Sequence, residues 1–292
     1  MRRLLLALLA LIASLAPVLA QTGPPKPKVP SGRHPGGVVV ALIGAGVDYR
    51  RPEIAARLAR DGEGEIIAWD VIDDDPRPLE TPPIAGRRVP PHAGTAVTEI
   101  VLSEAGATSL VPVRIPDANP MALGGALAFV ARTPARVALL LPGAAKDEPL
   151  ALFTDIARQA RHLVLIAPAG HFGGDGVSVP GLANLILVTA TDAQGRILPG
   201  VTTGANRVDV AVPVPADVAA GREAQDAAAL AEAVAAARLA ALAARLVAVE
   251  PGLDGAALKA RILSYAKPLP GEAESRTRAG WIADVKRIHW LE

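Results

Sequence analysis

The feature that most constrains the fold is a regular alternation of short apolar runs with segments of helical pattern. The first run, Val38–Ile43, is aliphatic throughout and ends in Gly-Ala-Gly, which is typical of a strand buried on both faces. The further predicted strands are Glu65–Val71, Ser109–Val113, Val137–Leu141, Leu163–Ala167, Leu185–Thr189 and Val208–Val212, and the predicted helices between them are Pro52–Asp61, Thr95–Ser103, Met121–Ala131 and Leu150–Gln159. This alternation predicts an α/β fold with a doubly wound, mainly parallel sheet and helices on both faces.

The C-terminal part of the chain is expected to be helical and then irregular. A long helix, about Glu223 to Val249, is apolar nearly all round, which predicts burial in the core. Its charged residues, Glu232 among them, argue against a membrane span. A further helix is expected over Asp254–Tyr265, with Asp254 as its N-cap. The tail, Lys267–Glu292, carries two of the three tryptophans and is expected to pack against the body.

The N-terminus has the pattern of a secretory signal. Two arginines precede an apolar run, and small residues end at Ala20, where cleavage is expected. A membrane anchor is the alternative, but Leu4–Ala20 is short for a span of about 30 Å and Pro17 interrupts it. The sequence therefore predicts a signal peptide over 1–20, an extended and poorly ordered Pro/Gly-rich leader over 21–37, and one domain over 38–292. The mature protein is expected in the periplasm or secreted, without stable membrane insertion.

Composition excludes several classes of function. The chain has 30 Lys plus Arg against 29 Asp plus Glu, and removal of the signal leaves 28 against 29. A near-neutral chain without a basic block is a poor candidate for nucleic-acid binding. Cysteine is absent, which excludes disulfides and thiolate catalysis.

The sequence predicts neither a bound cofactor nor a metal. The Gly-rich turn Gly44–Gly46 fails the dinucleotide fingerprint because Tyr49 stands where its third glycine would be. His171 and Asp175 are two potential metal ligands without a third. Asp73–Asp75 could coordinate calcium, but three consecutive acids cannot all face one ion unaided, so a solvated charged loop is expected.

Several segments, in order and at matching spacing, resemble motifs of the subtilisin-like serine proteases. They are Val40–Tyr49 with Pro52-Glu53-Ile54, Trp69-Asp70 with Asp73–Pro76, Ala93–Thr98, Leu110–Arg114, Ala167–His171, Val208–Pro213, Leu230–Pro251 and Leu253–Ala266. The resemblance covers roughly residues 38–268. It implies a subtilisin-like α/β fold for this chain.

The same resemblance implies that the catalytic side chains are missing. The aspartate that would orient the histidine falls at Gly44, the general base at Ala93, the nucleophilic serine at Ala233, and the asparagine of the oxyanion hole at His171. Acyl transfer needs a nucleophile, a base and a group that orients the base, and neither glycine nor alanine supplies any of these. The first hypothesis is an exported pseudoenzyme that binds or scaffolds another envelope protein or a peptide.

Two other hypotheses remain. An active serine-type endopeptidase or other hydrolase could use a non-standard site such as Ser178 with His171. Rescue of the triad by neighbours is not expected. His92 is one residue before the expected base, and a slip of one residue at a helix start turns the side chain by about 100°. Asp48 lies four residues after the expected aspartate. The third hypothesis is a periplasmic domain that binds a small molecule.

Overall fold

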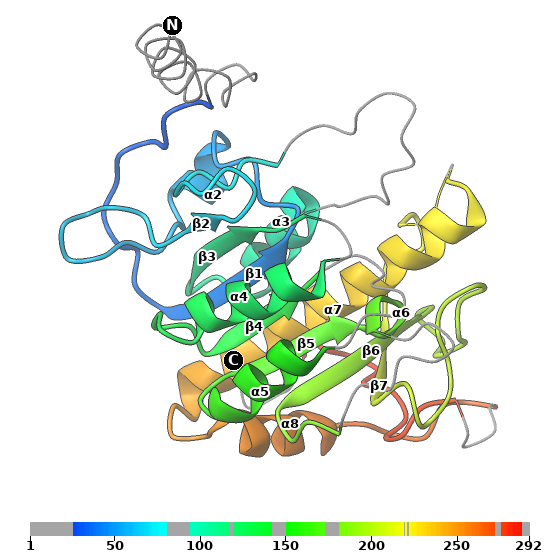
Figure 1. The fold of residues 1–292 in the computed structure, drawn as a ribbon. Helices are drawn as coiled ribbons and strands as arrows, with labels where there is room; N and C mark the ends of the chain where they lie inside the picture. The colour runs from blue at the N-terminus through cyan, green and yellow to red at the C-terminus, as the bar shows by residue number, and fades with distance from the viewer. Residues whose placement is uncertain are drawn as a thin grey trace, which may run out of the picture.

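The computed structural model describes residues 26–80, 94–116, 119–141, 150–172, 181–218, 220, 222–271 and 276–287. Seven strands form one sheet in the order β2-β3-β1-β4-β5-β6-β7, and every neighbouring pair is parallel (Figure 1). The strands are β1 (Val38–Gly44), β2 (Trp69–Asp70), β3 (Thr108–Arg114), β4 (Val137–Leu140), β5 (Val164–Pro168), β6 (Leu185–Thr191) and β7 (Val210–Pro213). The helices are α2 (Pro52–Ala55), α3 (Gly94–Glu104), α4 (Pro120–Val130), α5 (Ala151–Gln159), α6 (Ala169–Phe172), α7 (Ala224–Val249) and α8 (Gly255–Leu263). The predicted doubly wound fold is confirmed.

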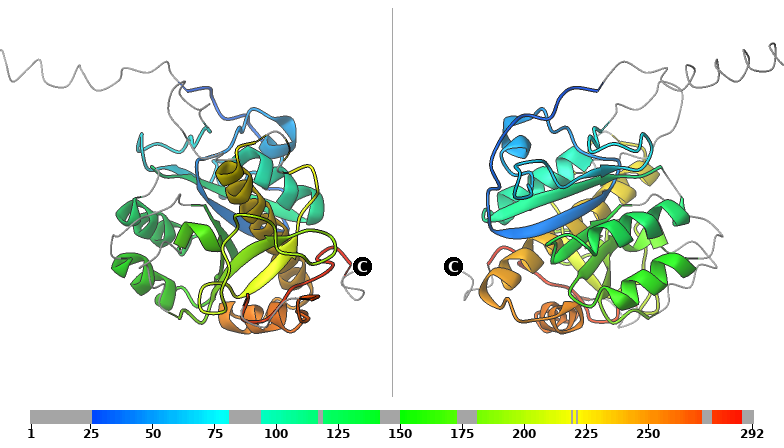
Figure 2. Two further views of the ribbon diagram at one scale, coloured as in Figure 1. Left: turned by 90° about the vertical axis from the view of Figure 1, so that its right-hand side faces the viewer. Right: turned by 60° about the vertical axis from the view of Figure 1, so that its left-hand side comes forward.

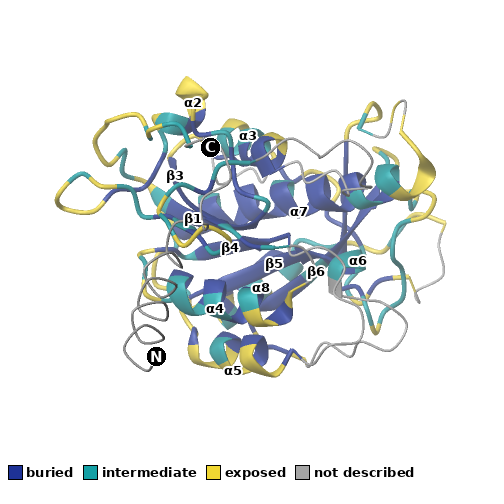
Figure 3. Ribbon diagram, turned by 45° about the horizontal axis from the view of Figure 1, so that its top comes forward, coloured by how far each residue is buried: buried dark blue, intermediate teal, exposed yellow. Residues whose placement is uncertain are grey.

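The helices cover both faces of the sheet, because alternate residues of each buried strand point to opposite sides. Val40 and Leu42 of β1 belong to a core shared with α3, α7 and α8. Val39, Ala41 and Ile43 of the same strand belong to a second core shared with α4 and α5. Figure 2 shows the two helical layers on either side of the sheet, and Figure 3 shows how completely the central strands are buried.

The longest helix, α7, is a core element. It matches the predicted range Glu223–Val249 to within one residue. By length and hydropathy it could cross a membrane, but 83% of its most apolar stretch is buried inside the protein. Its alanines let it approach the strands closely, and it contacts β1, β4, β5, β6 and β7.

Two predictions near the N-terminal edge were wrong in extent. The helix predicted over Pro52–Asp61 ends at Ala55, because the chain then runs extended beside β3, where the N–H of Ala59 donates to the carbonyl of Leu110 at 2.8 Å. The strand predicted over Glu65–Val71 is reduced to β2, since the residues before it fold back in a turn. Pairing with β3 overrides the helical pattern in the first segment, and pairing with residues 59–61 replaces the start of the strand in the second.

The tail packs along the outer edge of the sheet, as expected. Ala211 of β7 donates its N–H to the carbonyl of Gly280 at 2.9 Å and accepts the N–H of Ile282 at 3.0 Å. The intervening Trp281 is 9% exposed. Among the described residues, the tail thus covers β7, while Trp290 lies outside them.

Candidate functional site

Ligands of doubly wound sheets bind beyond the carboxyl ends of the strands. Strand β1 ends at Gly44 and β5 ends at Pro168. Since β1, β4 and β5 are parallel neighbours, these ends lie at one side of the sheet, called here the carboxyl edge. The short helix α6 follows β5 there and carries His171.

A glutamate from α7 binds the turn that begins α6. Glu232 Oε2 accepts the N–H of Gly170 at 2.9 Å. Its Oε1 accepts the N–H of Thr202 at 2.5 Å and the hydroxyl of Thr189 at 3.4 Å. A Cβ at position 170 would lie 2.5 Å from Oε2, so only glycine allows this approach. The carboxylate therefore joins three segments at the carboxyl edge.

Glu232 is almost completely buried, with 3% of the residue exposed. Burial raises the pKa of its carboxyl above the ordinary value, and the hydrogen bonds from Thr202 and Gly170 offset part of this effect. Backbone N–H groups that face the carboxyl edge here are thus satisfied by the protein's own side chain.

A second glutamate binds the N-terminus of α3. Glu80 Oε1 accepts the N–H of Gly94 at 2.9 Å, and its Oε2 accepts the N–H of Thr95 at 2.9 Å together with the Thr95 hydroxyl. These are donors that a helix leaves unpaired in its first turn. Asp48 lies beside them, because its N–H donates to Thr95 Oγ1 at 2.8 Å. The side chain of Asp48 pairs instead with Arg50 at 2.7 Å, and this hydrogen bond lowers the pKa of the Asp48 carboxyl.

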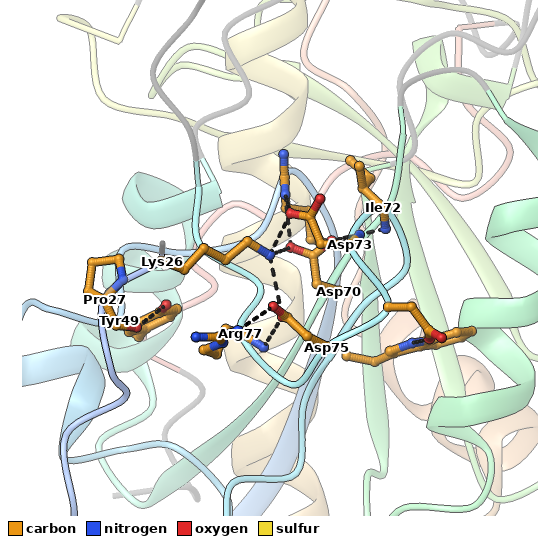
Figure 4. Close-up of polar contacts among 11 residues, drawn as sticks. Lys26, Pro27, Tyr49, Asp70, Ile72, Asp73, Asp75 and Arg77 are labelled. Carbon is orange, nitrogen blue, oxygen red and sulfur yellow. Dashed lines mark hydrogen bonds and ion pairs between the residues drawn. The ribbon is translucent and has the colours of Figure 1, made fainter. Parts of the chain in front are cut away.

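An ion cluster lies one strand away, where β2 and β3 end (Figure 4). Lys26 Nζ lies 2.5 Å from Asp70, 2.7 Å from Asp73 and 3.3 Å from Asp75. Arg114 Nη1 lies 2.8 Å from the same Asp70 oxygen. The Asp70 side chain is fully buried, so it depends on both cations. We call these residues, together with Arg77, which pairs with Asp75 at 3.1 Å, the Lys26 cluster.

Comparisons with known proteins agree with the topology. No protein-family model matches the chain, and no curated protein matches it. A cold-adapted subtilisin-like serine proteinase matches with a TM-score of 0.61 and 16% identity over 91% of this chain and 95% of that one. The structure described as the subtilase cytotoxin SubAB assembly matches with a TM-score of 0.59 and 17% identity, over 89% of this chain and 91% of that one. The epidermin leader peptide processing serine protease of Staphylococcus aureus matches with a TM-score of 0.55 and 13% identity, over 87% of this chain and 76% of that one.

The fold is subtilisin-like. At these identities the similarity concerns the fold alone. The assignment of individual residues to catalytic positions therefore rests on the sequence resemblance and stays a prediction.

Within the subtilisin-like fold, three of the four predicted positions are described. Gly44 ends β1, where an added Cβ would lie 3.1 Å from the Cβ of Leu141. His171 lies in α6, next to the glycine that Glu232 contacts. Ala233 lies in α7, nine residues after its first residue, and is 5% exposed. The prediction that this helix begins well before position 233 is confirmed. Ala93 lies outside the described residues.

The structure describes some of the residues named in the alternative hypotheses and not others. His92, Asp175 and Ser178 lie outside the described residues. Calcium was the alternative considered at Asp73–Asp75, and two of these three carboxylates, those of Asp73 and Asp75, are bound to Lys26. The third, Asp74, accepts the indole N–H of Trp69 at 3.1 Å. Within the described part of the chain, no group of three or more histidine or acidic side chains could hold a metal ion.

Sequence reasoning missed both glutamates and the lysine. Glu232 had a signal that could have revealed it, since a single acid within an alanine-rich, apolar helix must find donors when buried. Glu80 and Lys26 had none, because they lie in segments without periodic pattern and their partners are 14 and 44 residues away.

Proposed function

We propose that this chain is an exported pseudoenzyme of subtilisin-like fold that binds or scaffolds an envelope protein or a peptide. The observation that carries the proposal is the position of residues 232 and 233. Where the resemblance puts the nucleophile, an alanine stands inside a continuous helix, and the glutamate before it occupies the turn at the predicted oxyanion position. An acyl oxyanion would find the Gly170 N–H already bound to a carboxylate.

The main alternative is hydrolysis at a non-standard site. The hydroxyls of Thr189 and Thr202 both contact Glu232. That of Thr189 is fully buried and donates to the carbonyl of Thr202 at 2.7 Å. A buried hydroxyl held by a carbonyl cannot reach an incoming peptide. This geometry argues against Thr189 as a nucleophile.

Two features support binding in the cell envelope. The signal-like N-terminus favours export. The complete sheet with its helices retains the frame of the fold, and the sequence resemblance places Gly44, Ala93 and Ala233 at the catalytic positions. A subunit of the same fold occurs in the SubAB assembly, which is a precedent for this fold in a complex. Fold alone does not define the partner.

The proposal is tested by incubating the purified protein with a fluorophosphonate probe and with casein, beside an active subtilisin. We expect neither labelling nor turnover. Labelling that disappears in Ser178→Ala or Thr189→Ala would establish the hydrolase instead. In-cell crosslinking followed by mass spectrometry of the envelope fraction then identifies the partner, and recovery of the chain only in the cytoplasm would contradict export.

A further inference from the structure

The segment 26–37, called here the N-terminal strap, is fixed to the body without regular secondary structure. It contains neither helix nor strand, as expected for the leader. Among the described residues, no backbone-to-backbone hydrogen bond involves 26–35. The ladder to β3 begins only at Val38. The strap is therefore held by side chains alone, in contrast to the poor order that composition predicts.

Side chains hold the strap at three polar sites, and the partly buried Val29 also packs against the hydrophobic core. At its start, Lys26 enters the Lys26 cluster, with 14% of its side chain exposed. Next to it, the hydroxyl of Tyr49 donates to the carbonyl of Pro27 at 2.9 Å (Figure 4). Further along, Arg60 donates from Nη2 to the carbonyl of Pro30 at 2.6 Å and from its backbone N–H to Nδ1 of His34 at 3.0 Å. Of these polar contacts, that of Lys26 joins opposite charges, whereas Tyr49 and Arg60 donate to neutral acceptors.

A pair of glycines joins the strap to β1. Gly36 and Gly37 have φ values of 75° and 79°, which other residues rarely adopt. At Gly37 an added Cβ would lie 2.2 Å from the carbonyl oxygen of Ala107. The chain turns sharply at this point between the strap and the sheet, so the pair is placed to act as a hinge.

We propose that the N-terminal strap is a latch that opens and closes as one unit about Gly36 and Gly37, with Lys26 as the contact that keeps it closed. A segment without backbone pairing is among the first to open locally while the rest of the fold stays intact. In the closed state, three carboxylates face Lys26, Arg77 and Arg114. In the open state the same carboxylates face two cations and carry a net negative charge at the end of β2.

The charged contact makes the latch sensitive to salt. Screening lengths fall from about 10 Å at 0.1 M to about 3 Å at 1 M ionic strength, and salt screens exposed charges more than buried ones. Salt should therefore weaken the contact of Lys26 with Asp73, whose side chain is 46% exposed, more than its contact with the buried Asp70. Opening exposes Asp70, whose side chain is otherwise fully buried. The surface that appears is acidic and fits a cationic group.

The chain offers a matched control for the test. Lys28 lies two residues after Lys26, is exposed, and has no ion pair with the described residues. Lys26→Met and Lys28→Met therefore change the net charge equally. Because the protein has no cysteine, Ser31→Cys in the exposed middle of the strap accepts a single spin label.

The measurement is the mobile fraction of the label by electron paramagnetic resonance, with circular dichroism as a check of the fold. We expect Lys26→Met to raise the ratio of mobile to immobile label about tenfold, because it removes charge-assisted contacts, and Lys28→Met to leave it unchanged. Salt at 1 M should raise the ratio in the unsubstituted strap and not in Lys26→Met.

Equal mobile fractions in the two variants would overturn the proposal. Mobility that rises only together with loss of the global circular dichroism signal would overturn it too, because the strap would not then open as a separate unit. The milder Asp73→Asn, at a carboxylate that is 46% exposed, keeps the test informative if Lys26→Met does not fold. It should raise the mobile fraction in the same direction by a smaller factor.

Discussion

Replacing Glu232 by alanine tests whether the carboxylate at the carboxyl edge stabilises the fold. The substitution removes the acceptor of two backbone N–H groups, those of Gly170 and Thr202, whereas the Thr189 hydroxyl keeps its shorter hydrogen bond to the Thr202 carbonyl. Each N–H that loses its partner costs about 1–2 kcal/mol, with the lower value where water can enter. Alanine recovers only a few tenths of a kcal/mol in helix propensity. We expect Glu232→Ala to lower the free energy of unfolding by about 2–4 kcal/mol.

The assay is urea unfolding at pH 7, followed by circular dichroism. Glu250→Ala is the control, because Glu250 lies at the end of the same helix, is one third exposed and pairs with the partly exposed Arg261. An exposed pair of this kind contributes about 0–1 kcal/mol. Formate should restore part of the melting temperature of Glu232→Ala, since it fits the space left by the carboxylate. Equal losses in the two variants would refute the argument.

Four further results are expected. The raised pKa of Glu232 means that the folded protein holds this proton more tightly than the unfolded chain, so stability falls as pH rises above 4.5; Glu232→Gln should remove this part of the pH dependence of urea unfolding. The hydrogen bond from Lys26 lowers the pKa of Asp73, so Asp73 stabilises the folded protein above pH 3.8 and this stabilisation is lost as pH falls through the folded pKa. Asp73→Asn should therefore reduce the loss of stability at acid pH in the same urea-unfolding measurement. Gly280 has a φ of 97°, and an added Cβ would lie 2.0 Å from the Lys267 carbonyl oxygen. Gly280→Ala should therefore lower the free energy of unfolding by more than about 2 kcal/mol in the same assay. At Gly252 an added Cβ would meet open space, so Gly252→Ala should change this free energy by no more than about 0.5 kcal/mol. Ala233→Ser should show no fluorophosphonate labelling, because position 233 is 5% exposed and lies within the continuous helix α7; labelling at this serine would contradict the proposed function.

The sequence predicts those parts of the molecule whose signals are local. The buried strands and α7 followed from continuous apolar runs, because a segment surrounded by core must be apolar on every side. The helix predicted over Pro52–Asp61 was wrong because pairing with β3 outweighs propensity after Ala55. The partners of Glu232 lie 30 and 62 residues away, and no periodic pattern encodes such contacts. The carboxyl edge was predictable, but not the side chains that fill it.

The covering of the sheet edges limits how another chain can associate with this protein. At one end, β2 is two residues long, and on the other side residues 280–282 already occupy β7. Backbone groups at exposed strands are where proteins add foreign strands and grow fibrils. In the described part of the chain neither end leaves a long strand free for that purpose. Self-association by strand addition at these two edges is therefore disfavoured.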